Sequence, residues 1–131
     1  MGSNPFAGTK ESMYKLNSIN KKFGRISYIY LKDFKEIIDV FKSYFTKRDI
    51  KKIEKENFND VLSIHSLIIF DNYRKKGFGS KLLNEVIDKY KNKKCILIAD
   101  KREDKTLPEF YKKNGFRKLF TCKSGQFMIR G

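Results

Sequence analysis

The spacing of apolar residues separates two kinds of segment along the chain. Apolar residues three or four positions apart on an otherwise polar surface are typical of helices, whereas unbroken runs of β-branched and aromatic residues are typical of strands. The first spacing predicts helices over 33–45, 46–57, 77–91 and 106–115. The second predicts strands over 25–31, 61–70 and 94–99, and further strands are expected over 14–18 and, as a hairpin, over 116–121 and 126–130.

The residue types at three predicted helix starts agree with these boundaries. A serine, threonine or aspartate at a helix start, with a carboxylate three positions later, forms a capping box that satisfies free N–H groups of the first turn. The chain offers this pattern three times, as Asp33 with Glu36, Thr46 with Asp49, and Thr106 with Glu109. The last of these helices stops at Gly115, a residue type that favours the left-handed backbone of a helix terminus.

The segment 61–70 predicts the central strand of a sheet. Regular alternation puts one set of side chains on one face and the other set on the opposite face, namely Ser63, His65, Leu67 and Ile69 against Leu62, Ile64, Ser66, Ile68 and Phe70. The strand, helix and strand over 61–99 predict a right-handed crossover between parallel neighbours, and the terminal hairpin adds antiparallel strands. The fold class is therefore α/β with a mixed sheet.

Length and composition predict a single compact domain. The chain has 131 residues, of which 40% are hydrophobic, enough for one core. Residues 1–12 combine turn formers without periodicity, so we expect a disordered leader, or residues ahead of a natural start at Met13, before a domain over 13–131. Cys95 and Cys122 follow no metal-binding or disulfide pattern, and we expect no metal.

The charge balance gives a secondary indication of partners. A formal net charge of +15 attracts nucleic acid or acidic protein whatever the fold. Only six of the 30 basic residues are arginine, and the lysines are spread over every segment, which is weaker evidence for a phosphate-reading surface than clustered arginine. No run is long enough for a membrane span and no signal-peptide core is present, so the prediction is a cytoplasmic protein without a membrane partner.

The turn between the central strand and the next helix carries the clearest chemistry. Arg74, Gly77 and Gly79 precede the helix, whose first N–H groups point into solvent at its positive end. Such a turn binds anions, most naturally phosphate. Its spacing matches neither the dinucleotide fingerprint, which needs a small residue where Leu82 stands, nor the Walker loop, which needs lysine directly after the second glycine.

Two segments together resemble a known family. The first is Arg-x-x-Gly-x-Gly from Arg74 to Gly79, with Ile69 five positions before the arginine. The second, over 107–116, is Leu-Pro-Glu-Phe-Tyr-Lys-Lys-Asn-Gly-Phe, an aromatic-Tyr-x-x-x-Gly-Phe helix end. In this order they resemble the signatures of the GCN5-related N-acetyltransferases (GNAT). The resemblance covers roughly residues 60 to 120. It implies an acyl-CoA N-acyltransferase fold, acetyl-CoA as cosubstrate and transfer of acetyl to a primary amine.

Carried over residue by residue, the resemblance also implies a binding site. The backbone amides of the turn would bind the pyrophosphate, and the main chain around Ile69 would pair with the pantetheine arm as an added strand. The expected cofactor-binding residues are Leu67, Ile68, Ile69, Arg74, Lys75, Lys76, Gly77, Phe78, Gly79, Ser80 and Tyr111.

Two side chains are candidates for proton transfer. Tyr111 matches the family tyrosine that protonates the departing thiolate. His65, the single histidine of the chain, lies on the central strand, where amine-specific members carry a base, and imidazole titrates near neutrality. A relay of water molecules is the competing route for the proton of the amine.

The acceptor side is less defined. The resemblance directs attention to residues 33–57 and to the turn near 121–126, and the charged loop over 100–104 has no assigned role. A small amine, a protein lysine or N-terminus, and the amino group of an aminoacyl-tRNA all stay open as acceptors, for a monomer or a homodimer. Two other functions compete: a basic nucleic-acid-binding module with aromatic residues on a sheet face, and a relative that binds acyl-CoA without catalysis.

Overall fold

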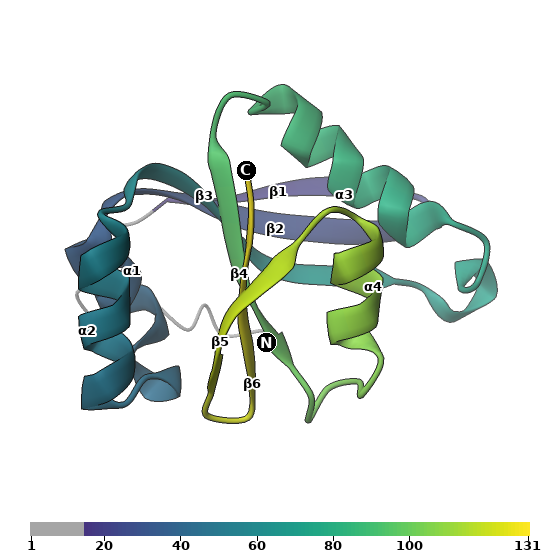
Figure 1. Cartoon of the computed structure of the whole chain (residues 1–131). Helices are drawn as coiled ribbons and strands as arrows, with labels where there is room; N and C mark the ends of the chain where they lie inside the picture. Colours follow the sequence, from purple (N-terminus) through teal and green to yellow (C-terminus); the bar gives the residue numbers. More distant parts are fainter. Residues whose placement is uncertain (1–14) are drawn as a thin grey trace.

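The computed structural model describes residues 15–131, which form one six-stranded sheet with helices on both of its faces (Figure 1). The strands are β1 Leu16–Lys21, β2 Gly24–Asp33, β3 Asn59–Ile69, β4 Lys94–Asp100, β5 Arg117–Cys122 and β6 Gly125–Arg130. The helices are α1 Phe34–Phe41, α2 Lys47–Glu56, α3 Phe78–Lys89 and α4 Leu107–Lys113, with short 3-10 helices η2 Lys42–Tyr44 and η3 Asp71–Tyr73. The predicted order of strands and helices and the mixed α/β fold class are thus confirmed, whereas the expectation for residues 1–12 lies outside the described residues.

The sheet divides into two halves between β3 and β4. Its strand order is β1-β2-β3-β4-β6-β5, and within it β3 and β4 are parallel, as the crossover predicted. This parallel pairing is short, running from Val61 opposite Lys94 to Ser63 opposite Ile96. Beyond Ser63 the two strands diverge: in Figure 1 β1 to β3 run across the view, while β4 to β6 run from top to bottom. The carboxyl-terminal half of β3 therefore keeps β2 as its partner on one side only.

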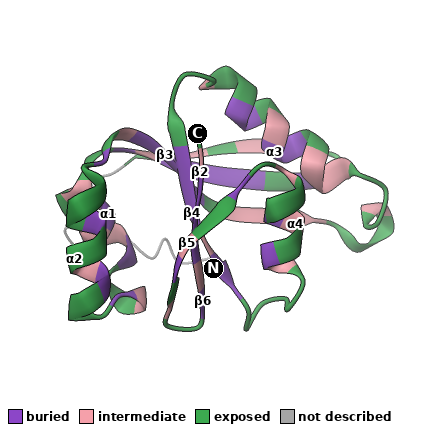
Figure 2. Cartoon of the chain, in the orientation of Figure 1, coloured by how far each residue is buried: buried purple, intermediate pink, exposed green. Residues whose placement is uncertain are grey.

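Each face of the sheet has its own apolar cluster. On one face α3 and α4 pack against the strands, with Ile26, Leu62, Ile64, Leu82, Leu83, Val86, Leu97, Tyr111 and Met128 among the buried residues. On the other face α1 and α2 do so, with Ile29, Leu31, Ile37, Phe41, Phe45, Ile53, Ile96 and Phe127 among them. Figure 2 shows β4 buried along most of its length between these layers, which confirms that its continuous apolar run belongs to a strand covered on both faces.

The predicted alternation along β3 is wrong after Ile64. The pairing with β2 shifts here, because Tyr28 lies opposite Ile64 and Ser27 opposite Ser66, which leaves His65 as an extra residue. Such a bulge exchanges the faces of all later side chains. Leu67 and Ile69 therefore share the α3 and α4 face with Ile64. Regular alternation had put them on the face of Ser63.

The three predicted capping boxes have different outcomes. Thr46 and Asp49 form a full box at the start of α2. At α1, Asp33 accepts a hydrogen bond from the Glu36 amide, but the Glu36 carboxylate accepts from the Lys32 amide instead of the Asp33 amide. At α4 the box predicted from Thr106 and Glu109 is absent, because the side chain of Thr106 does not cap the helix. The backbone amide and the hydroxyl of Thr106 donate instead to Asp104, at 2.8 and 2.6 Å.

Candidate functional site

The end of β3, the following turn, the start of α3 and the start of α4 enclose a groove of about 650 Å³. It is lined by Leu67, Ile68, Ile69, Tyr73, Arg74, Lys75, Gly77, Phe78, Gly79, Ser80, Glu103, Asp104, Thr106, Leu107 and Phe110. Every expected cofactor-binding residue except Lys76 and Tyr111 is in this set. Lys76 lies exposed in the turn, and Tyr111 lines a second cavity, described below.

The turn before α3 presents backbone amides to this groove. Lys75 and Gly77 have positive φ angles of +62° and +83°, a conformation that glycine adopts without strain and lysine does not. Gly77 is the N-cap of α3, and no side chain caps the first turn. The first amides of α3 therefore lack both helical and side-chain acceptors at the positive end of the helix dipole. This arrangement suits a phosphate group.

Gly79 is required for a different reason from Gly77. An ideal Cβ on Gly77 would meet nothing within 4 Å, so its role is conformational. A Cβ on Gly79 would lie 3.3 Å from Cζ of Phe110 and 3.7 Å from Cγ1 of Ile69. The missing side chain allows the start of α3 to approach both α4 and the end of β3, which closes the groove at its base.

The side chain of Arg74 turns back onto its own loop. Its Nε donates to the carbonyl oxygen of Ile69 at 3.1 Å and lies 3.4 Å from the Asp71 carboxylate. The arginine thus stabilises the turn, and one lone pair of the Ile69 carbonyl is already in use. Phe78 holds the other side of the turn, with its ring stacked on Phe23 at a centroid distance of 4.4 Å.

A hydrogen-bond network that the sequence analysis missed joins the turn to α4. Asn114, at the end of α4, donates to the Ser80 hydroxyl at 3.1 Å and to the Phe110 carbonyl at 2.9 Å. Asn84 of α3 donates to the Asn114 side chain at 3.2 Å and to the Ser80 carbonyl at 2.8 Å. Asn84 and Ser80 are 30 and 34 positions from Asn114, so no local sequence pattern indicated the contacts. The network fixes the distance between the anion-binding turn and the helix that carries Tyr111.

A second cavity, of about 310 Å³, lies where β3 and β4 diverge. It is lined by Val40, Phe41, Ser43, Tyr44, Ile64, His65, Ser66, Leu67, Leu97, Ile98, Asp100, Glu103, Leu107 and Tyr111. Leu67, Glu103 and Leu107 line the first groove as well, so the two spaces adjoin. Part of the expected acceptor segment, 40–44, contributes to this second cavity, whereas the turn 121–126 does not.

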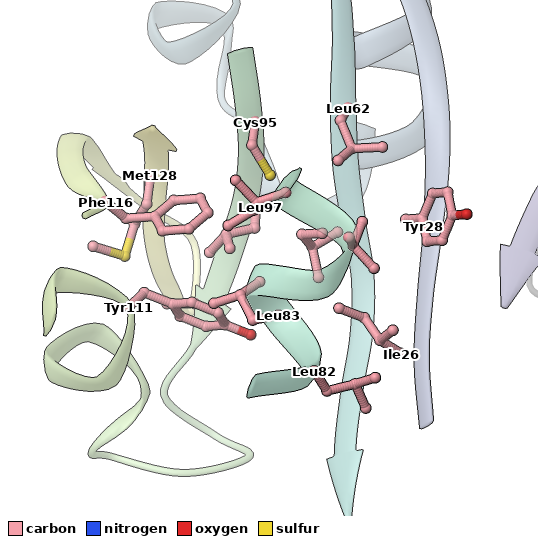
Figure 3. Close-up of a cluster of buried hydrophobic side chains, with 14 residues drawn as sticks. Ile26, Tyr28, Leu62, Leu82, Leu83, Cys95, Leu97, Tyr111, Phe116 and Met128 are labelled. Carbon is pink, nitrogen blue, oxygen red and sulfur yellow. The ribbon is translucent and has the colours of Figure 1, made fainter. Parts of the chain in front are cut away.

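Tyr111 is buried in the apolar cluster that α3 and α4 form with the sheet. Figure 3 shows its ring directed from α4 toward Leu83 of α3, and it also packs on Phe110 and Phe116 at centroid distances of 5.1 and 5.6 Å. Burial raises the pKa of the Tyr111 phenol, and the negative charge of Glu103 raises it further. The phenol therefore stays protonated at neutral pH.

His65 occupies the bulge of β3 and lines the second cavity. Although the residue keeps considerable exposure overall, desolvation lowers the pKa of its imidazole below the ordinary value near 6.5. The ring is thus neutral at neutral pH, which is the form that accepts a proton. The bulge that overturns the predicted alternation is also the feature that presents this side chain.

Two acidic residues, one at the end of β4 and one in the loop that follows it, also line the second cavity, although no role was predicted for them. Asp100 is buried and accepts hydrogen bonds from the Tyr44 hydroxyl at 2.9 Å and from Arg102 Nη2 at 2.8 Å. These hydrogen bonds, from Arg102 above all, lower the pKa of Asp100 to about 2. Glu103 is exposed and lines both spaces. Tyr44 and Asp100 are 56 positions apart, so sequence gave little sign of the contact.

The combined site has a polarity that limits its chemistry. One end offers backbone amides and Arg74 and Lys75 for an anion, while the other offers carboxylates, a neutral imidazole and a protonated phenol.

Helices pack against both faces of the described sheet. The alternative of a nucleic-acid-binding module needs an open sheet face with aromatic residues, and residues 15–131 do not offer one. No helix within 15–131 is long and apolar enough to cross a membrane.

Comparison with protein families gives a match over most of the chain. The family model described as "Acetyltransferase (GNAT) domain" matches residues 27–118. This range extends from β2 to the start of β5 and includes both the groove and the second cavity. A comparison with curated proteins gave no match.

Solved structures share the fold at low sequence identity. The anti-CRISPR protein AcrVA5 matches with a TM-score of 0.58 at 19% identity, over 88% of this chain and 98% of that chain. PH1933 from Pyrococcus horikoshii OT3 matches with a TM-score of 0.55 at 20% identity, over 92% of this chain and 65% of that chain. NAA60 from Arabidopsis thaliana, solved in complex with acetyl-CoA, matches with a TM-score of 0.56 at 16% identity, over 82% of this chain and 64% of that chain. This chain thus spans just under two thirds of the last two proteins.

Proposed function

Because the chain belongs to the acetyltransferase (GNAT) domain family, we propose that it is an acetyl-CoA-dependent N-acetyltransferase that modifies a primary amine by direct attack on the thioester. The observation that carries this proposal is the junction of the two spaces at Leu67, Glu103 and Leu107. An anion-binding groove meets a cavity with proton-transfer groups there, so a bound donor and a bound amine would come together.

The residues of the groove suit acetyl-CoA, which supplies an activated acetyl group as a thioester. The amides of residues 74–79 and the uncapped first turn of α3 would hold the pyrophosphate. Leu67 to Ile69 belong to the half of β3 that has no strand beside it on the β4 side. Its backbone can therefore pair with the amide-containing pantetheine arm, as an edge strand pairs with a peptide.

We infer that two side chains of the second cavity transfer protons. His65, neutral because desolvation lowers its pKa, accepts the proton that the amine loses. Tyr111, protonated because burial raises its pKa, donates to the departing thiolate. Transfer from a phenol to a thiolate needs close contact away from water, where the proton affinity of the thiolate also rises. The burial of Tyr111 supports this role.

The proposal is tested by calorimetric titration with acetyl-CoA, followed by an assay for thiol release with added amines. We expect binding in the micromolar range. Gly79→Glu should raise the Kd by about 100-fold or more, because its side chain meets Phe110 and places a carboxylate beside the phosphate site. Asn92→Glu is the matched control, since it adds the same charge in an exposed turn beyond the other end of α3.

Two outcomes would contradict the proposal. One is the absence of binding at tens of micromolar acetyl-CoA, and the other is binding that Gly79→Glu leaves intact. If acetyl-CoA binds but no amine releases coenzyme A, the catalytic part is wrong, and the chain is an acyl-CoA-binding relative without activity.

A further inference from the structure

We propose that the second cavity accepts a primary ammonium group on an unbranched alkyl stem, and that Glu103 binds this group. This inference rests on the function proposed above and names the class of acceptor for the same site. Its starting point is the charge of the cavity. The chain carries 30 lysines and arginines, yet none of them lines this cavity, while two carboxylates do.

The two carboxylates differ in their availability. Asp100 is buried and already bound by Tyr44 and by Arg102, so its role is structural. Glu103 is exposed, and within residues 15–131 no ion pair or side-chain hydrogen bond holds its carboxylate. It is also the one charged residue that lines both spaces. An ammonium group bound to Glu103 would therefore lie where the groove and the second cavity meet, in the cavity that Tyr111 also lines.

The walls of the cavity define the rest of the acceptor. Half of the lining residues are the polar groups already named and two serines, and the other half are apolar, namely Val40, Phe41, Ile64, Leu67, Leu97, Ile98 and Leu107. Its volume of about 310 Å³ is at the lower limit for small-molecule sites. The apolar half of the walls can bury the methylene groups of a stem, while the carboxylate of Glu103 binds its charged end. An α-amino group, which has a polar carbonyl two bonds away, suits these walls poorly, and an acceptor with its own carboxylate would be repelled by Glu103.

The acceptor class is tested by comparing amines at saturating acetyl-CoA and at equal concentrations of the ammonium form, which is the form that Glu103 would bind. From propylamine to pentylamine we expect kcat/KM to rise about 16-fold, since each of the two added methylenes contributes roughly a fourfold gain when buried. Alaninamide, an α-amine, should react at least about tenfold more slowly than pentylamine. Nα-acetyllysine amide separates the sources of this chemistry: a rate equal to that of pentylamine indicates a site that reads only the stem, and a tenfold higher rate indicates a lysine side chain of a polypeptide.

The role of Glu103 is tested with a pair of matched variants. Glu103→Gln should raise the KM for pentylamine about tenfold, with the kcat and the Kd for acetyl-CoA nearly unchanged. Glu109→Gln makes the same change on α4 at a residue that lines neither space, and it should behave as the wild type. An unchanged KM in Glu103→Gln, or a preference for alaninamide over pentylamine, would overturn this inference while the proposed acetyltransferase activity stands. Failure of the wild-type protein to bind acetyl-CoA would instead contradict the proposed function.

Discussion

The groove and the second cavity adjoin, but the chain builds them in different ways. The groove is formed mainly by one continuous stretch, from Leu67 to Ser80, and α4 closes it. The second cavity is formed by side chains from four separate segments, over 40–44, 64–67, 97–103 and 107–111. The groove contains the uncapped first turn of α3, with its free backbone amides, whereas the second cavity contains several titratable side chains.

This difference teaches which parts of the site tolerate change. A backbone amide persists whatever side chain its residue carries, provided that the turn keeps its conformation. The lysine at position 75, with its positive φ of +62°, shows that the backbone geometry of the turn prevails over residue preference. A phenol or an imidazole has no such substitute. We therefore expect side-chain truncations to affect turnover strongly in the second cavity and binding only weakly in the groove.

Among the side-chain truncations, the largest expected effect is that of Tyr111→Phe. Loss of the proton donor should lower kcat about 100-fold, while the Kd for acetyl-CoA stays the same because Tyr111 does not line the groove. Steady-state thiol release and calorimetry measure the two quantities. Tyr90→Phe, which removes a hydroxyl from a residue lining neither space, is the control. An unchanged kcat would leave Tyr111 as a packing residue and weaken the contrast between the two regions.

A smaller effect, of about tenfold on kcat/KM near neutral pH, is expected for His65→Gln. His65 must be neutral to act as a base, and its pKa is lowered by desolvation. The wild-type rate should therefore fall as pH drops below about 6.5, and this limb should vanish in the variant. Tyr44, Asp100, Glu103 and Tyr111 face the same cavity. Asp100 titrates near pH 2, outside this range.

The measurement for His65 is the ratio of the wild-type and variant pH profiles. This ratio cancels the ionisation of the acceptor amine, which both proteins share. A ratio that does not change with pH would favour the competing water relay over His65 as the base.

The smallest expected effect is that of Arg74→Ala. Its guanidinium already interacts with the Ile69 carbonyl and with Asp71, and its exposure to solvent weakens any added attraction for phosphate. The Kd for acetyl-CoA should rise less than about fivefold, with Arg48→Ala on α2 as the control. A loss of about 100-fold in calorimetry would show that side chains, and not backbone amides, provide the phosphate site.

Prediction from sequence succeeded where the structure depends on neighbours along the chain. The turn with Gly77 and Gly79 could be recognised because its residues are contiguous, although the need for Gly79 depends on its contact with Phe110 of α4. The cap at α4 failed because Asp104, two positions before Thr106, accepts hydrogen bonds from the Thr106 amide, which Glu109 would need as its donor, and from the Thr106 hydroxyl, which would have to accept from the helix. The alternation along β3 failed at His65 because a bulge depends on the pairing with β2, which no single strand sequence reports.

The sequence by itself determined the order of strands and helices, the continuous burial of β4 and the glycine-containing turn before α3, because each follows from periodicity or from residues within a few positions of one another. Only the tertiary structure decided that β3 and β4 separate after three residue pairs. It also decided that Tyr111 belongs to the second cavity and that Tyr44, Asp100 and Glu103 meet there. These features depend on contacts between residues far apart in the chain, which only the packed sheet brings together.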